Sequence, residues 1–117
     1  MKKIEAIIRT SKFGEVQEAL RQAGIDFFTY ADVTGVGNEV EKAEHSYRVT
    51  VYDTSYISRQ LLTIVVRDIN VQKTVDAVLK SAKTGEIGDG KIFVSTIDES
   101  YRIRNAEKGD TSLYNKE

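Results

Sequence analysis

The sequence predicts an α+β fold in which six elements follow one another in the order β-α-β-β-α-β. Four stretches are rich in alternating or β-branched apolar residues, which is typical of strands. Two further stretches carry apolar residues at helical spacing, and glycines or short polar runs separate the elements. We therefore expect a four-stranded antiparallel sheet that carries two helices on one face.

The first half of the chain supplies a strand, a helix and a second strand. Residues 3–9 alternate between apolar and polar side chains and predict the first strand. A helix is predicted after Ser11, a candidate N-terminal cap, and glycine favours its termination at Gly24. Residues 25–36 form a second extended run with aromatic and β-branched side chains. The apolar stripe of the helix consists of Phe13, Val16, Ala19, Leu20 and Ala23.

The second half repeats the pattern with a strand, a helix and a last strand. Residues 61–66 are apolar on both faces, which favours a central position in the sheet. A helix is predicted after Asn70, again a candidate cap, and residues 92–97 predict the fourth strand. The apolar stripe of this helix is Val71, Val75, Val78, Leu79 and Ala82. This order of elements is typical of the ferredoxin-like fold, which supports many functions and names none of them.

Length and charge limit the possible functions. The 117 residues suffice for one core, and we expect a domain over residues 1–104 followed by a polar tail over 105–117. The 17 basic and 18 acidic residues nearly cancel and are mixed along the chain. A nucleic-acid-binding surface would need a clustered basic excess, so we expect no nucleic-acid partner.

Residue types exclude several classes of chemistry. The sequence has no cysteine, which excludes disulfides and thiol catalysis, and its only histidine is His45. A zinc site or a Ser-His-Asp hydrolase is therefore not expected. No apolar run approaches the roughly 20 residues of a membrane span, and residues 1–9 lack the apolar core of a signal peptide. We expect a cytoplasmic protein that does not insert into membranes.

The segment between the second and third predicted strands, about residues 37–58, is much longer than a hairpin connection in such a domain. Its first part is charged, and its second part contains Tyr47, Tyr52 and Tyr56. Tyrosines in a long connection suit a docking surface, because they give contact area at low entropic cost. The alternative is a β-ribbon extension with partly buried rings.

The segment 84–94 places Gly85, Gly88 and Gly90 close together and follows them with Lys91. Glycines let a backbone turn tightly and lie against a polyanion, and successive N–H groups in such a turn form an anion site. The order differs from a Walker A loop, because the predicted helix precedes the glycines. A plain tight turn between a helix and a strand would use the same residue types, so both interpretations stand.

With these motifs the chain resembles the PII signal-transduction family, the nitrogen-regulatory family of ferredoxin-like trimers. The resemblance extends from Met1 to about Arg104. The motifs that carry it are Met1–Ile8, Gly35-Val36-Gly37, Thr84–Val94 and Tyr101-Arg102-Ile103-Arg104.

The resemblance implies a homotrimer with a site for ATP or ADP in each cleft between subunits. It implies that Arg102 and Arg104 reach the phosphates from the neighbouring subunit. Arginines at i and i+2 of an extended segment face one side and can grip phosphate, although on their own they could also be solvated charges. The implied phosphate ligands of the first subunit are Gly88, Asp89, Gly90 and Lys91. The residues implied near adenine or ribose are Thr29, Gly35, Gly37, Thr63 and Val65.

The resemblance also implies that the long segment is a T-loop, which docks on a target such as a membrane ammonium transporter. Tyr52 lies where many members carry a uridylylated tyrosine, but the surrounding residues depart from the usual pattern. In familiar members 2-oxoglutarate is held through Mg2+ and a glutamine, and a lysine pairs with its carboxylate. Here Glu39 and Arg59 occupy those positions. Glu39 offers Mg2+ an oxygen ligand but adds negative charge beside a dianion.

Two classes of function follow. We expect a nucleotide-sensing regulator of nitrogen metabolism without catalysis of its own, in which ATP and ADP favour different loop arrangements. The alternatives are a related regulator of another nucleotide, or a small phosphohydrolase on the same fold. For a hydrolase, Asp89 and Glu39 are the only candidate catalytic groups.

Overall fold

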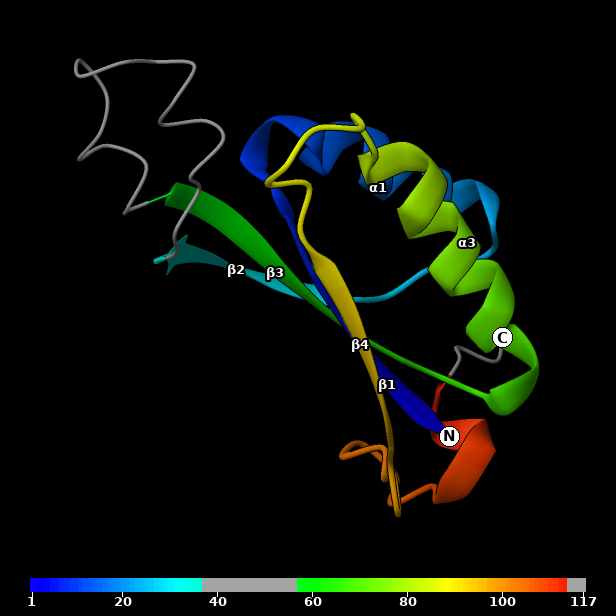
Figure 1. Cartoon of the computed structure of the whole chain (residues 1–117). Coiled ribbons are helices and arrows are strands. Elements are labelled where there is room, and N and C mark those ends of the chain that lie inside the picture. Colours follow the sequence, from blue (N-terminus) through cyan, green and yellow to red (C-terminus); the bar gives the residue numbers. More distant parts are fainter. Residues whose placement is uncertain (37–56, 114–117) are drawn as a thin grey trace, which may run out of the picture.

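The computed structural model describes residues 1–36 and 57–113. Six main elements follow one another (Figure 1), in the predicted order. They are β1 (Lys2–Arg9), α1 (Phe13–Gln22), β2 (Thr29–Gly35), β3 (Ile57–Val66), α3 (Val71–Ala82) and β4 (Lys91–Thr96). Three short 3-10 helices complete the description: η1 (Thr10–Lys12), η3 (Asp68–Asn70) and η4 (Gly109–Leu113).

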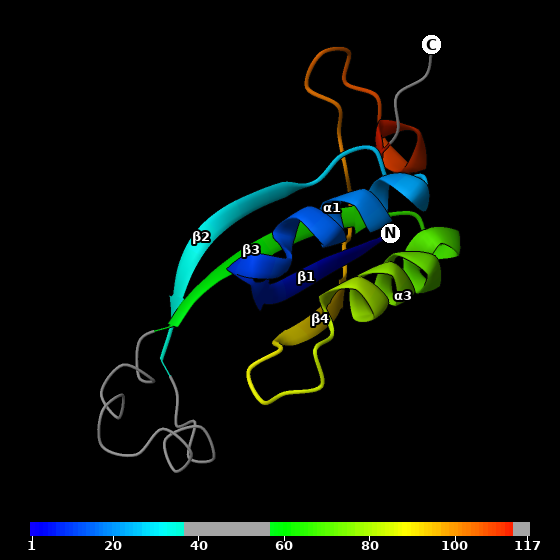
Figure 2. The same cartoon turned by 90° about the horizontal axis from the view of Figure 1, so that it is seen from above.

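The four strands form one antiparallel sheet in the order β2-β3-β1-β4. Ile4 of β1 lies between Ile64 of β3 and Val94 of β4, which fixes the register of the centre. Both helices cover the same side of the sheet (Figure 2). The ferredoxin-like fold class predicted from the sequence is therefore confirmed.

The core lies between the sheet and the two helices. The apolar residues at alternate positions of β1 and β3 point to this side, and each is at most 5% exposed. They meet the apolar stripes of α1 and α3, because a strand and an amphipathic helix can each bury only one face. Fully burying one such side chain contributes roughly 1.5–3 kcal/mol. The core residues include Ile4, Ala6, Ile8, Val16, Leu20, Leu62, Ile64, Val66 and Val78.

The second strand begins at Thr29 and not at residue 25, because Ile25 belongs to the C-terminal cap of α1. The N–H of Ile25 donates to the carbonyl of Leu20 (2.9 Å), and that of Gly24 donates to Arg21 (3.0 Å). These are the two hydrogen bonds of a Schellman motif, and Gly24 supplies the left-handed residue, with φ +84°. The predicted end of α1 at Gly24 is confirmed.

The third strand begins at Ile57 and not at residue 61, so it includes Arg59 and Gln60. Both are polar, yet each is 8% exposed. Gln60 Nε2 donates to Asp32 Oδ1 (2.7 Å) on the paired strand β2. These polar residues interrupt the hydropathy pattern, which is why the pattern places the start of the strand too late.

The predicted helix caps differ from those in the structure. Each helix continues from a short 3-10 helix, and Ser11 lies inside η1 rather than at an N-cap. Asn70 does occupy the N-cap position of α3, but its side chain makes no capping hydrogen bond. The helices begin where the sequence predicts, while the tighter turn before each one takes the place of a side-chain cap.

The two ends of the sheet carry different segments. The loop over residues 83–90 leads from α3 to β4 at the end where β1 finishes (Figure 1). Residues 97–113 lie at the opposite end, near the start of β1, where the N–H of Ile97 donates to the carbonyl of Met1 (3.0 Å). The segment from residue 105 onward, expected to be a polar tail, contains η4, and its Lys108 forms an isolated bridge with Tyr101.

Gly90 lies so close to β1 that a side chain does not fit. It has φ +106°, and a Cβ atom there would come within 1.7 Å of the Ile7 carbonyl oxygen. Gly90→Ala is expected to destabilise the protein by about 3 kcal/mol, through steric overlap and left-handed strain together. Gly85→Ala is the matched control, because Gly85 also has positive φ (+91°) but open space around it. Urea unfolding of both variants measures the difference, and equal losses would contradict the close contact.

Candidate functional site

A hollow of about 470 Å³ opens on the helix-free side of the sheet, where the loop over residues 83–90 passes the ends of β1 and β3. Its lining includes Gly35, Arg59 and the predicted phosphate-binding segment 88–91. Apolar walls come from Ile7, Ile57 and Phe93. The structure thus brings together six residues that the sequence predicts as site residues, beside an apolar surface.

The loop is organised around the carboxylate of Asp89. The backbone N–H of Thr84 and that of Gly85 each donate to Oδ2 at 2.9 Å. The Thr84 hydroxyl and Arg9 Nε donate to Oδ1, the latter at 3.0 Å. The Thr84 hydroxyl, followed by the two N–H groups and Arg9, holds the pKa of Asp89 well below its usual range. The carboxylate is therefore ionised at neutral pH and fixes the shape of the loop.

Two arginines hold carbonyl groups of the same loop. Arg9 Nη2 donates to the carbonyl oxygen of Ile87 at 3.0 Å, and Arg59 Nη2 donates to that of Gly88 at 3.0 Å. In a trans peptide the next N–H points away from the carbonyl, so these bonds also set the directions of the following N–H groups. The loop backbone is fixed by charged groups from β1 and β3 as well as by Asp89.

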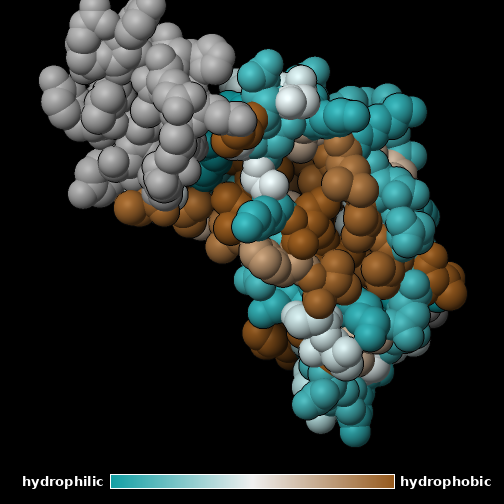
Figure 3. Space-filling view, viewed as in Figure 1, coloured by the Kyte–Doolittle hydropathy of each residue, from teal (hydrophilic) through white to brown (hydrophobic). Residues whose placement is uncertain are grey.

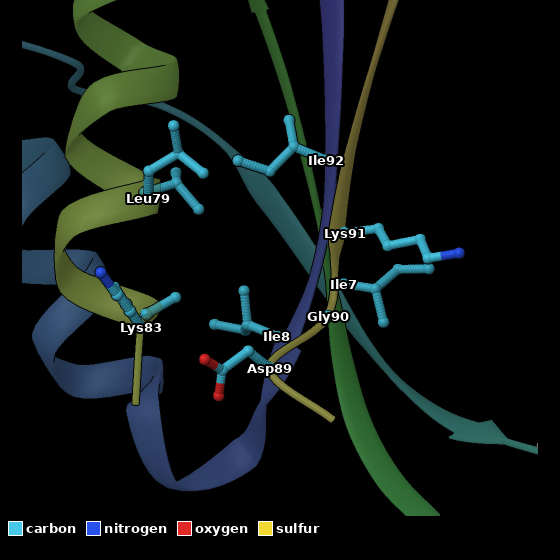
Figure 4. Close-up of a pocket in the computed structure, with 10 residues that line it drawn as sticks. Ile7, Ile8, Leu79, Lys83, Asp89, Gly90, Lys91 and Ile92 are labelled. Atoms are coloured by element: carbon cyan, nitrogen blue, oxygen red, sulfur yellow. The ribbon is translucent and has the colours of Figure 1, made fainter. Parts of the chain in front are cut away.

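The side chains of Asp89 and Lys91 point to opposite sides of the sheet (Figure 4). A second hollow, of about 380 Å³, lies between α3 and β4 and is lined by Leu79, Lys83 and Ile92. The Asp89 carboxylate points to this side, whereas Lys91 points away from α3, to the open face of the sheet. Lys91 is exposed and lies at the rim of the 470 Å³ hollow.

Other predicted residues lie elsewhere in the chain. Thr29 and Thr63 are paired across β2 and β3, and Val65 pairs with Lys3 near the start of β1. All three are on the open face, outside the lining of the 470 Å³ hollow. Gly37, Glu39 and Tyr52 lie outside the described residues.

Arg102 and Arg104 follow β4, at the end of the sheet opposite to the glycine loop. Arg102 is held by its own segment: Nε donates to Glu107 Oε1 and Nη2 donates to the carbonyl of Thr111, both at 2.9 Å. Arg104 is exposed. Within one chain, the two arginines and Lys91 therefore lie at opposite ends of the sheet.

Sequence reasoning missed Arg9 and Thr84, which shape the loop through Asp89. Arg9 is the last residue of an alternating strand, and alternation indicates the face of a side chain but not its partner. Within residues 1–36 and 57–113, no group of three or more histidine, cysteine or acidic residues is placed to hold a metal ion. Over the same residues, no helix has the length and apolar character that crossing a membrane requires.

Replacing Asp89 tests the construction of the loop. Asp89→Asn replaces one acceptor oxygen with an NH₂ group, which is a donor and cannot accept the hydrogen bonds made to the carboxylate. We expect this change to lower the free energy of unfolding by about 2 kcal/mol at pH 7. The pKa of Asp89 is lowered in the folded protein, so its contribution is complete above the unfolded value of about 4 and is lost as the pH falls through the folded value. Urea unfolding at fixed protein concentration should show the gap between wild type and variant shrinking below about pH 4. A gap independent of pH would contradict this role.

Comparison with known proteins agrees with this arrangement. The sequence model of the P-II family, described as nitrogen regulatory protein P-II, matches residues 1–107. The nitrogen regulatory protein P-II of Bradyrhizobium diazoefficiens is 44% identical over 109 residues, which cover 93% of this chain and 96% of the relative. That of Nostoc punctiforme is 44% identical over 113 residues, covering 97% of this chain and all of the relative (100%).

A third relative extends the comparison. Nitrogen regulatory protein P-II 2 of Methanothermobacter thermautotrophicus is 45% identical over 113 residues, which cover 97% of each chain. The family match covers the glycine loop, the strand-end glycine at Gly35 and both arginines after β4. A match of this extent and identity, on the predicted fold, shows that the chain belongs to the P-II family of nitrogen regulatory proteins.

Proposed function

We propose that this nitrogen regulatory protein senses ATP and ADP, which bind in clefts between the three subunits of a homotrimer. The observation that carries the proposal is that two groups of predicted site residues lie at opposite ends of the sheet. Lys91 and the glycine loop are at one end of the sheet, and Arg102 and Arg104 are at the other. These groups can meet at one phosphate chain only if they come from different copies.

In the proposed cleft, one subunit contributes half of the nucleotide site. This half-site consists of the glycine loop, whose backbone can bind a phosphate group, and an apolar wall. Glycines at 88 and 90 let the backbone approach a phosphate group, while Lys91 brings a positive charge to the rim. The Asp89 side chain is engaged within the loop, so its contribution to phosphate binding would come from the backbone N–H. Ile7, Ile57 and Phe93 offer apolar surface to a nucleotide base or ribose.

The second half-site comes from the other end of a neighbouring subunit. Thr63 and Val65 on the open face, with Thr29 beside Thr63, lie in the same half of the molecule as Arg102 and Arg104. In the proposed trimer these residues approach the nucleotide together. The arginines then offer bidentate hydrogen bonds to the phosphate oxygens.

The exposed apolar surface supports assembly. Leu79 and Val94 are about half exposed (55% and 47%), and apolar side chains gather between α3 and β4 (Figure 3). On the open face, Phe93 is 52% exposed and lines the 470 Å³ hollow together with Ile7, which pairs with Leu61 of β3. Surfaces of this kind suit burial against other copies of the chain.

The remaining parts of the proposal concern the long segment over about residues 37–58, of which 37–56 lie outside the described residues, and Arg59 just after it. We propose that this segment acts as a T-loop that controls a partner such as a membrane ammonium transporter, in the cytoplasm. Mg2+ and 2-oxoglutarate would bind near Glu39 and Arg59. Arg59 borders the 470 Å³ hollow, so a carboxylate bound there would share its guanidinium with the carbonyl of Gly88. Tyr52 is a candidate for covalent modification.

Two observations favour a regulator over a phosphohydrolase on the same fold. The curated relatives are named as regulatory proteins. The Asp89 carboxylate accepts hydrogen bonds from three residues within its own chain and is poorly placed to activate water. A different nucleotide ligand is the other alternative, and a lysine combined with two arginines favours a polyphosphate over AMP or a cyclic dinucleotide.

Removing the charge of Lys91 tests the phosphate site. Lys91→Ala is expected to weaken ATP binding at least about tenfold, which corresponds to about 1.4 kcal/mol, in calorimetric titration with Mg2+. Lys83→Ala is the matched control, since Lys83 borders the hollow between α3 and β4 instead. Equal affinity of the two variants would remove Lys91 from the nucleotide site.

The same titration with and without 2-oxoglutarate tests metabolite sensing. If both ligands share the site, ATP binds more tightly in the presence of 2-oxoglutarate, and by reciprocity 2-oxoglutarate binds more tightly with ATP. We expect Arg59→Ala to remove this coupling. ATP binding that is indifferent to the metabolite would leave a sensor of adenine nucleotides alone.

A further inference from the structure

We infer that Glu107 is a positioning residue for Arg102, and that the segment 101–111 is a preformed part of the nucleotide site rather than a passive tail. This inference rests on the proposed function, in which Arg102 reaches the phosphates bound by a neighbouring subunit. None of the predicted site residues lies beyond Arg104, so the inference gives residues 105–111 a role that the sequence analysis did not assign.

The backbone of this segment is closed into a compact turn. The N–H of Arg102 donates to the carbonyl of Glu107 (2.7 Å), and the N–H of Ala106 donates back to the carbonyl of Arg102 (2.8 Å). An isolated β-bridge joins Tyr101 and Lys108. Ala106 has φ +62°, and within residues 1–36 and 57–113 it is the one non-glycine residue with positive φ. Such a conformation costs energy and persists where the surroundings enforce it.

The turn also fixes the arginine side chain. Glu107 Oε1 accepts from Arg102 Nε and the carbonyl of Thr111 accepts from Nη2, each at 2.9 Å. Two acceptors on different nitrogens define the plane of the guanidinium, and the side chain is only 17% exposed. An arginine held in this way has already lost much of its rotamer freedom, so little more is lost when it meets a phosphate.

The ion pair could instead act as a competitor, with Glu107 occupying the guanidinium in place of phosphate. Two features favour positioning. The carbonyl group of Thr111 is neutral, so its hydrogen bond orients the Arg102 guanidinium without cancelling the positive charge. The backbone hydrogen bonds from Arg102 to Glu107 and from Ala106 to Arg102 hold the turn independently of the ion pair. The two roles predict opposite changes in affinity when the carboxylate is removed.

The test is a double-mutant cycle on ATP affinity, measured by calorimetry on the full-length protein. Glu107→Ala is expected to weaken ATP binding about fivefold to tenfold, because Arg102 loses an orienting partner. In an Arg102→Ala background the same change is expected to have no further effect. Glu107→Gln keeps the shape and an acceptor oxygen for Nε, so it should stay within about threefold of wild type.

Glu99→Ala is the matched control. Glu99 is a glutamate just before this segment, and its carboxylate pairs with Lys108 at 3.6 Å instead of with Arg102. We expect this variant to bind ATP as the wild type does. If Glu107→Ala does not assemble, Glu107→Asp, which withdraws the carboxylate by one methylene group, carries the same expectation of weaker binding.

The outcomes separate this inference from the proposed function. Wild-type protein that does not bind ATP, or an Arg102→Ala variant that binds it normally, would overturn both. If Arg102→Ala weakens binding while Glu107→Ala does not, only the positioning role fails. Tighter binding by Glu107→Ala would make the carboxylate a competitor. If Glu107→Ala weakens ATP binding by the same factor in the Arg102→Ala background as in the wild type, Glu107 is only a structural residue of the turn.

Discussion

The hydrogen bonds to the carboxylate of Asp89 are the interactions on which the shape of the glycine loop depends. The carboxylate accepts hydrogen bonds from the hydroxyl and N–H of Thr84, the N–H of Gly85 and the guanidinium of Arg9. Without it, a loop with three glycines between residues 84 and 91 would have many accessible conformations. With it, Lys91 and the glycine backbone face the open side of the sheet in one arrangement.

The fold places the two groups of candidate site residues at opposite ends of the sheet, where they cannot meet within one chain. Arg9 and Asp89 order the end with the glycine loop, and Arg102 and Glu107 order the other. In each case a carboxylate accepts a hydrogen bond from an arginine, Arg9 at the end of β1 and Arg102 after β4. Nucleotide binding between subunits would thus join two surfaces that are each prepared in advance, and the affinity of the cleft depends on both.

The fold was largely predictable because periodicity reports which face of an element is buried. The alternation in β1, the stripes of both helices and the glycine after α1 led to the correct elements. The polar start of β3 was not predictable, since Arg59 and Gln60 are buried through hydrogen bonds that hydropathy does not reveal. The glycine loop was predicted as a site. The roles of Arg9 and Glu107 depend on contacts across space, which one sequence does not record.

The pairing of Arg9 with Asp89 spans 80 positions of the chain, and β1 forms ladders only with strands that come much later in the sequence. Loops of this size must close before the central strand gains any of its partners, and such non-local topologies fold slowly. The glycine loop therefore takes its shape late, when nearly all of the chain is in place. The shape of the candidate site is in this way tied to completed folding, and a fragment that ends before β4 would leave β1 as an edge strand, paired with β3 on one side and unpaired on the other.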